Sequence, residues 1–148
     1  MHTMERYFVL EDTMEITDKI AQDVMKNVMK YAKILKKDPE NYEARAEIMW
    51  CGSLSHNGLT GCGTCGGDWA THLIEHELGG MFDVAHGAGL AAVWGSWARY
   101  VMDEKPERFA QFAVDVMGVE ESDDVKSTAL KGIEAVEEFY SCLLYTSP

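Results

Sequence analysis

The chain has 148 residues, of which 47% are hydrophobic and 26% charged, enough for one domain with a hydrophobic core. Its formal net charge is −12, and an acidic surface disfavours nucleic acid and anionic membrane as partners. No apolar run reaches the roughly 20 residues that a membrane-spanning helix requires. The amino terminus is polar and charged, unlike a signal peptide, so we expect a cytoplasmic protein.

The hydrophobic pattern predicts an all-α domain, because apolar residues recur at helical spacing and no stretch alternates as a strand does. Thr17 is the predicted N-cap of the first helix, which stops at the run Lys36-Lys37-Asp38-Pro39. Asn41 is the predicted cap of a second helix that runs toward His56. Residues 57–67 form a glycine-rich loop after it.

Four further helices are predicted in the rest of the chain. Their approximate ranges are 68–78, 86–102, 106–118 and 122–140. The first of them is expected to stop at Gly79-Gly80, because glycine weakens a helix. The helix over 86–102 is apolar nearly all round, which predicts a place in the core. Ser122 is the predicted cap of the last helix, which reaches Tyr140.

Three of the five histidines fall within fifteen residues, at His72, His76 and His86. Neutral imidazole is the commonest metal ligand among side chains. Residues four apart share one face of a helix, so His72 and His76 point the same way. A break at Gly79-Gly80 lets the chain return His86 to the same neighbourhood. From spacing alone we therefore predict a metal site that includes His76.

The residues of this region also allow two other interpretations. His72-Leu-Ile-Glu75-His76 matches H-x-x-E-H, in which both histidines bind zinc and the glutamate is the general base of a metallopeptidase. A non-catalytic helical module that binds metal or a partner is the other.

Cys62-Gly-Thr-Cys65 has C-x-x-C spacing inside a glycine run. A structural zinc site normally needs a second such pair or histidines at set spacings, and a redox pair usually opens a helix after a strand. An ordinary loop is the simplest reading, with a metal or redox role as alternatives.

Several stretches follow one another in a specific order and spacing. They are His2-Thr-Met-Glu-Arg-Tyr-Phe8, Asp38-Pro-Glu-Asn-Tyr-Glu-Ala-Arg-Ala-Glu-Ile-Met-Trp50, Asn57-Gly-Leu-Thr-Gly61, Gly67-Asp-Trp-Ala-Thr-His72, His76-Glu-Leu, His86-Gly-Ala-Gly-Leu90 and Trp97. Through them, nearly all of residues 2–140 resembles the iron-containing alcohol dehydrogenase family, in particular its butanol-dehydrogenase-like branch. The resemblance implies the metal-binding, all-helical carboxy-terminal domain of a dehydroquinate-synthase-like fold, preceded in the family by an α/β nucleotide domain.

The resemblance also implies a function. Family members transfer a hydride between a primary alcohol or aldehyde and NAD or NADP, with Fe²⁺ or Zn²⁺ polarising the substrate oxygen. The implied metal ligands are His2, His72 and His86, together with an aspartate. His76 matches a histidine beside the nicotinamide and substrate, which differs from the assignment by spacing. The branch inclines the cofactor toward NADP, and a homodimer of the full-length protein is expected.

The chain departs from the family pattern at both ends. The aspartate ligand belongs four residues before His2, and the α/β domain belongs before that. Residues 142–148 resemble a translated sequencing adapter. We therefore expect residues 1–141 to be a helical metal-binding domain truncated at both ends, and residues 142–148 to be a non-native tail. Such a fragment is expected to bind metal weakly and to be inactive alone.

Overall fold

The computed structural model describes residues 1–10 and 14–144, and every regular element in them is a helix. This confirms the all-α prediction. The chain divides into two compact units. The amino-terminal unit comprises His2–Gly67, and the carboxy-terminal unit comprises Met1 and the chain from Asp68 onward. Among the described helices, none combines the length and the apolar character needed to cross a membrane.

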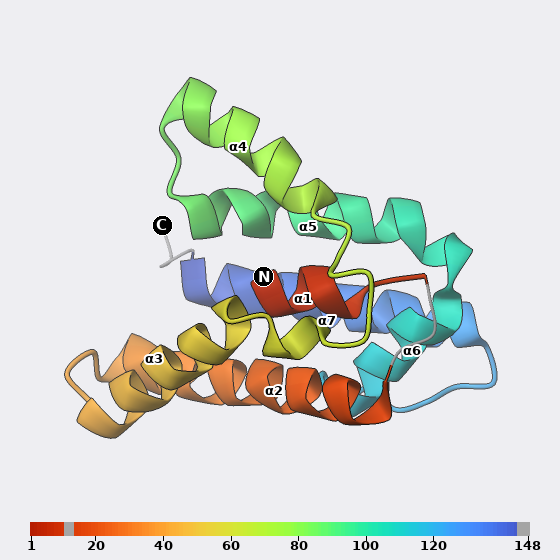
Figure 1. Cartoon of the computed structure of the whole chain (residues 1–148), viewed down its shortest axis with the longest axis horizontal. Helices are drawn as coiled ribbons and strands as arrows, with labels where there is room; N and C mark the ends of the chain where they lie inside the picture. The colour runs from red at the N-terminus through yellow and green to blue at the C-terminus, as the bar shows by residue number, and fades with distance from the viewer. Residues whose placement is uncertain (11–13, 145–148) are drawn as a thin grey trace. The chain divides into compact units, whose positions relative to one another are not determined.

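The amino-terminal unit contains four helical elements. They are α1 (His2–Tyr7), α2 (Glu15–Lys37), α3 (Tyr42–His56) and the 3₁₀ turn η1 (Leu59–Gly61). The two long helices α2 and α3 lie side by side (Figure 1), and α1 and η1 contact both of them. Tyr7, Ala21 and Ala44 are buried among these helices and form part of its core.

Hydrogen bonds from α1 fix that short helix to the end of α3. The Thr3 hydroxyl donates to Ser55 Oγ at 3.0 Å, and Arg6 Nη1 donates to the Ser55 carbonyl at 2.6 Å. This attachment places His2, the first residue of α1, beside His56, the last residue of α3. No element was predicted over α1, because six residues are too few to show a helical period.

The cap prediction at Asn41 is confirmed, and the one at Thr17 is wrong. Asn41 Oδ1 accepts a hydrogen bond from the Ala44 backbone N–H at 3.0 Å. Helix α2 instead begins before Thr17, with Met14 at its N-cap. Thr17 is buried, and its hydroxyl donates to the Cys62 carbonyl at 2.9 Å. The threonine therefore anchors the glycine-rich loop, a partner distant in sequence that local pattern does not reveal.

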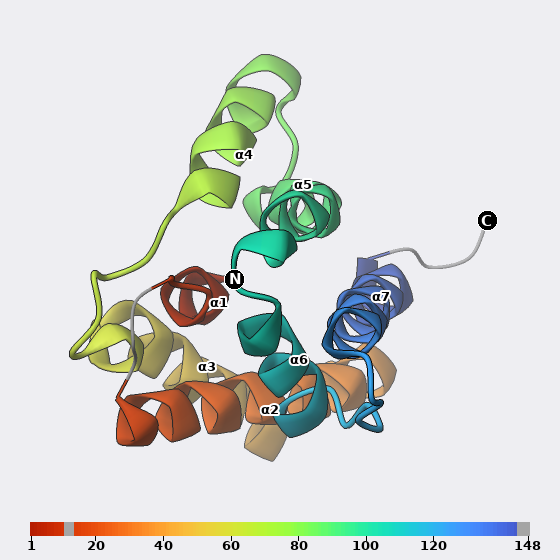
Figure 2. The same ribbon diagram turned by 90° about the vertical axis from the view of Figure 1, so that its right-hand side faces the viewer.

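The carboxy-terminal unit contains five helical elements in its described residues. They are α4 (Ala70–Phe82), α5 (His86–Val101), the 3₁₀ turn η2 (Met102–Glu104), α6 (Pro106–Asp115) and α7 (Val125–Leu144). Helix α5 contacts both α4 and α7, and α7 packs along α6. In Figure 2, α5 and α7 are both seen nearly end-on.

The core of this unit is built on aromatic side chains of α5 and α6. Trp94 is almost fully buried, and its ring centroid lies 6.5 Å from that of Phe112. Trp97 and Phe109 form a similar pair at 6.4 Å. Burial of such large rings contributes much of the hydrophobic stabilisation of a small unit. The core role predicted for the helix over 86–102 is thus confirmed.

Three predicted helix ends are wrong: the end of α4, and both ends of the last helix, for which Ser122 was the predicted cap. Helix α4 continues through Gly79-Gly80 and ends at Phe82, where Asp83 takes a left-handed conformation with φ of 53°. The last helix begins at Val125, and the Asp124 carboxylate accepts from the Lys126 N–H at 3.1 Å. It runs past Tyr140 to Leu144. Most of the predicted non-native tail, residues 145–148, lies outside the described residues, so that boundary stays a prediction.

Candidate metal centre

Three histidines converge at the hairpin formed by α4 and α5. His72 and His76 lie one turn apart on α4, and their ring centroids are 6.3 Å apart. The ring of His86 lies 5.4 Å from that of His72 and 5.6 Å from that of His76. The convergence predicted from the spacing of the three residues is therefore present.

The reversal between the two helices brings His86 to this cluster. The left-handed Asp83 ends α4, and Ala85 is the N-cap of α5 with extended backbone angles. His86 is the first residue of α5, and α5 returns along α4 (Figure 1). Helix α4 ends later than predicted. His86 still returns to the cluster, because this requires only a reversal of the chain between α4 and α5.

The three imidazoles differ in their surroundings. His72 is buried, and the edge of the Trp69 ring lies against it with centroids 5.1 Å apart. His76 and His86 are exposed. Trp69 itself has φ of 64°, a left-handed conformation that is uncommon for a residue with a Cβ and marks a locally constrained backbone. The cluster thus has a buried wall at His72 and an open side at the other two rings.

Sequence reasoning considered Glu75 only as a peptidase base, whereas the structure gives it a different contact. Its side chain is almost completely buried, and its Oε2 forms a hydrogen bond with His86 Nδ1. A signal was present in the sequence, because Glu75 lies between two histidines on the helix. Its partner on the next helix was not readable from that spacing.

The donor set fits a divalent first-row metal. One ligand atom from each of Glu75, His76 and His86 lies within 4.8 Å of the other two. Ligand atoms around a tetrahedral zinc ion are about 3.3 Å apart, since zinc–nitrogen bonds are about 2.0–2.1 Å. Imidazole nitrogen and carboxylate oxygen suit zinc and iron. The chemistry of the donors gathered here therefore fits such a metal.

The fourth histidine named from the resemblance lies in the other unit. The ring of His2 stands 4.0 Å from the ring of His56, whose Nδ1 lies 2.8 Å from the Gly52 carbonyl. Its assignment as a metal ligand stays a prediction.

Among the described residues, the metal grouping of Glu75, His76 and His86 does not include the C-x-x-C pair. Cys62 and Cys65 are free and exposed, and the loop that carries them is anchored through Thr17. Cys51 differs, since it is buried on α3 and its burial raises the pKa of its thiol.

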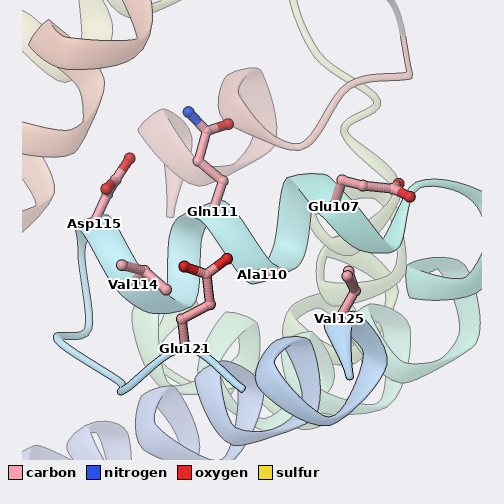
Figure 3. A pocket seen from close by; sticks show the side chains of 7 residues that line it. All are labelled: Glu107, Ala110, Gln111, Val114, Asp115, Glu121 and Val125. Carbon is pink, nitrogen blue, oxygen red and sulfur yellow. The ribbon is translucent and has the colours of Figure 1, made fainter. Parts of the chain in front are cut away.

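A pocket of about 310 Å³ lies elsewhere in the carboxy-terminal unit (Figure 3). Its lining comes from α6, the segment after α6 and the start of α7, and includes none of the three histidines. The lining combines the acidic residues Glu107, Asp115 and Glu121 with the apolar residues Ala110, Val114 and Val125. It offers no nitrogen ligand, so the candidate site is the histidine cluster.

Comparison with known proteins decides the family. The model of the Fe-containing alcohol dehydrogenase family, C-terminal, matches residues 1–147. The chain belongs to this family. It is 34% identical to NADH-dependent butanol dehydrogenase A of Clostridium acetobutylicum over 96% of its own length. It is 36% identical to probable NADH-dependent butanol dehydrogenase 1 of Bacillus subtilis, again over 96% of its length.

Solved structures of the iron-containing alcohol dehydrogenase family share this fold. The NADH-dependent butanol dehydrogenase A of Thermotoga maritima matches 97% of the chain with a TM-score of 0.91 and 38% identity. The aldehyde reductase YqhD of E. coli matches 96% of the chain with a TM-score of 0.90 and 31% identity. The chain covers 35% and 37% of those two chains.

The match spans a limited part of each relative. The chain covers 36% of the Clostridium protein and 37% of the Bacillus protein. The metallopeptidase and free-standing module readings gain no support from these relatives, all of which are named as dehydrogenases or a reductase.

Proposed function

We propose that this chain is the metal-binding helical part of an NAD(P)-dependent alcohol or aldehyde dehydrogenase. The convergence of His72, His76 and His86 beside a buried carboxylate carries the proposal. The reaction class is supported by relatives named butanol dehydrogenase and NADPH-dependent aldehyde reductase. The small-molecule substrate is therefore a primary alcohol or its aldehyde, and hydride passes between its carbon and the nicotinamide ring.

His72, His86 and His2 are the proposed protein ligands of the metal, with an aspartate as the fourth. When bound, Fe²⁺ or Zn²⁺ supplies a Lewis acid for the substrate oxygen. His76 is the proposed catalytic residue beside the substrate and nicotinamide. Its exposure supports this role, because an imidazole in contact with solvent can pass the proton of the alcohol hydroxyl outward.

A second ligand set exchanges His72 for His76. The spacing of ligand atoms among Glu75, His76 and His86 favours it. The burial of His72 against Trp69 favours the first set, because a metal ligand held by packing needs little ordering on binding.

The cofactor is proposed only as NAD or NADP. The butanol dehydrogenases that the chain matches are named NADH-dependent, so they give no support to the preference for NADP. We also propose that the longer protein is a homodimer in the cytoplasm.

Zinc titration of the purified chain tests this proposal. We expect His72→Ala and His86→Ala each to weaken zinc binding at least about tenfold, since each removes a ligand, and His76→Ala to weaken it much less. Glu77→Ala is a matched control on the same helix, because Glu77 is exposed. Isothermal titration calorimetry measures the zinc affinities of the four variants and of the unchanged chain. Tight binding that is unchanged by His86→Ala contradicts the metal centre. Loss of binding in His76→Ala and His86→Ala, but not in His72→Ala, selects the second ligand set.

Activity assays test whether the reaction requires the α/β domain in addition to this chain. In this proposal the nicotinamide is held by an α/β domain, and residues 1–10 and 14–144 contain no strand. We expect no oxidation of butanol by the purified chain with NAD or NADP. Turnover by the chain alone contradicts the proposed need for the α/β domain.

A further inference from the structure

Glu75 is a charged side chain enclosed between two helices. Only 2% of its side-chain surface is exposed, whereas 48% of the His86 side-chain surface is exposed. Burying a carboxylate is costly unless a donor or a positive charge compensates for the lost water. The compensating group is the imidazole of His86, whose Nδ1 contacts Glu75 Oε2.

We propose that Glu75 is a positioning residue that holds His86 with its Nδ1–H toward the carboxylate, so that the lone pair on Nε2 would be available to a metal. This inference rests on the proposed function and extends it, because neither the spacing nor the resemblance gave Glu75 a role there. Glu75 is then not a ligand, although its oxygen lies within the candidate grouping.

The chemistry of imidazole explains what the contact does. A neutral imidazole carries one proton, on Nδ1 or on Nε2, and the hydrogen bond at one nitrogen decides which nitrogen keeps a lone pair. A carboxylate that accepts from Nδ1–H leaves the lone pair on Nε2. It also stops the ring from rotating, so less conformational entropy is lost when a metal binds.

Two glycines provide the room for this carboxylate. A Cβ at Gly89 on α5 would stand 2.7 Å from Glu75 Cγ and Oε1, closer than real Cβ contacts. A Cβ at Gly79 on α4 would stand 3.3 Å from Oε1. Glu75 therefore passes directly against the backbone of the first turn of α5, the turn that begins with His86. A methyl group at Gly89 displaces the carboxylate without altering any titratable group.

Nitrogen-15 NMR of the metal-free chain tests the positioning directly. At about pH 8, above the ordinary pKa of imidazole, long-range proton–nitrogen spectra distinguish the two tautomers. The chain has five histidines, so substitution of each in turn assigns the signals. We expect His86 to be protonated at Nδ1 in the unchanged chain and in Glu75→Gln, because glutamine still offers an accepting oxygen. We expect a mixed tautomer in Glu75→Ala and in Gly89→Ala.

Glu77→Gln is the matched control, since it removes an exposed carboxylate two residues away on the same helix. It should leave the His86 signals unchanged. Circular dichroism confirms that each variant keeps its helices. The same tautomer balance in Glu75→Ala as in the unchanged chain, or an Nε2-protonated His86 in the unchanged chain, overturns the proposal.

Zinc affinity provides the second readout. Loss of a carboxylate that orients a metal-bound histidine typically lowers affinity about 10–100-fold. We expect a fall of that size in Glu75→Ala and Gly89→Ala, and a smaller one in Glu75→Gln. Unchanged zinc affinity in Glu75→Ala overturns the positioning role. A chain that binds no zinc in any form contradicts the proposed metal centre instead, and the metal-free spectra still decide whether Glu75 positions His86.

Discussion

The contact between α6 and α7 depends on the absence of a side chain at Gly132. A Cβ built there would lie 2.5 Å from Ala113 Cβ and 3.0 Å from Ala113 Cα. Ordinary contacts of this kind begin at 3.4 Å, so the first falls about 0.9 Å short. Because the second atom is backbone, no side-chain rotation relieves the overlap. Gly132→Ala therefore forces the two helices apart by nearly 1 Å.

The size of the effect follows from two opposing contributions. Overpacking of a well-packed core costs about 1–3 kcal/mol, and a backbone clash belongs at the upper end. Alanine recovers about 1 kcal/mol of helix propensity over glycine. We expect Gly132→Ala to lower the free energy of unfolding by about 1–2 kcal/mol. For a chain of this size that corresponds to a fall in Tm of about 2–8 °C.

Urea unfolding followed by circular dichroism measures the change, with Gly80→Ala as the matched control. Gly80 is also helical and lies in the same unit, but nothing lies within 4 Å of a Cβ at that position. Its substitution should raise stability by about 0.5–1 kcal/mol through helix propensity alone. The double substitution Gly132→Ala with Ala113→Gly should show a favourable coupling of at least about 1 kcal/mol. Gly132→Ala as stable as the unchanged chain refutes this account of the helix contact.

Three further predictions concern the amino-terminal unit. Thr17→Val removes the hydrogen bond to the Cys62 carbonyl, so we expect the free energy of unfolding in urea to fall by about 1 kcal/mol. The exposed substitution Lys19→Ala is the control and should lower it less. In thiol titration with a chromogenic disulfide, Cys51 should react much more slowly than the exposed Cys62, because it is buried and its thiol pKa is raised; equal rates would contradict that burial. The folded chain holds the Cys51 proton more tightly than the unfolded chain, so the contribution to stability is full below the ordinary pKa of 9.0 and is lost as pH rises above it. The free energy of unfolding, measured across that pH range, should fall less steeply with rising pH in Cys51→Ala than in the unchanged chain.

The helices were largely predictable because their signals are local. Apolar periodicity depends on residues three and four apart, and the Asn41 cap depends on a residue three positions away. The convergence of the three histidines was equally accessible, since it required only a shared helix face and a reversal of the chain.

Two of the wrong predictions followed a local preference that the folded chain does not obey. Thr17 resembles a cap by its residue type, but the Cys62 carbonyl, far along the chain, satisfies its hydroxyl. Gly79-Gly80 resembles a helix end, but α4 continues through it, and Gly79 lies close to the Glu75 carboxylate. For Thr17 a tertiary contact outweighed a local preference of about 1 kcal/mol. For Gly79-Gly80 the helix continues although glycine costs about 1 kcal/mol in a helix interior.

The sequence by itself therefore determined the helical class, the resemblance to the family and the histidines that gather at one hairpin. Only the tertiary structure decided which neighbour each polar group meets. Glu75 shows the difference, because its burial and its bond to His86 depend on how closely α5 approaches α4 at Gly89. That approach is set by packing between helices, and packing is a property of the folded chain that no local pattern encodes.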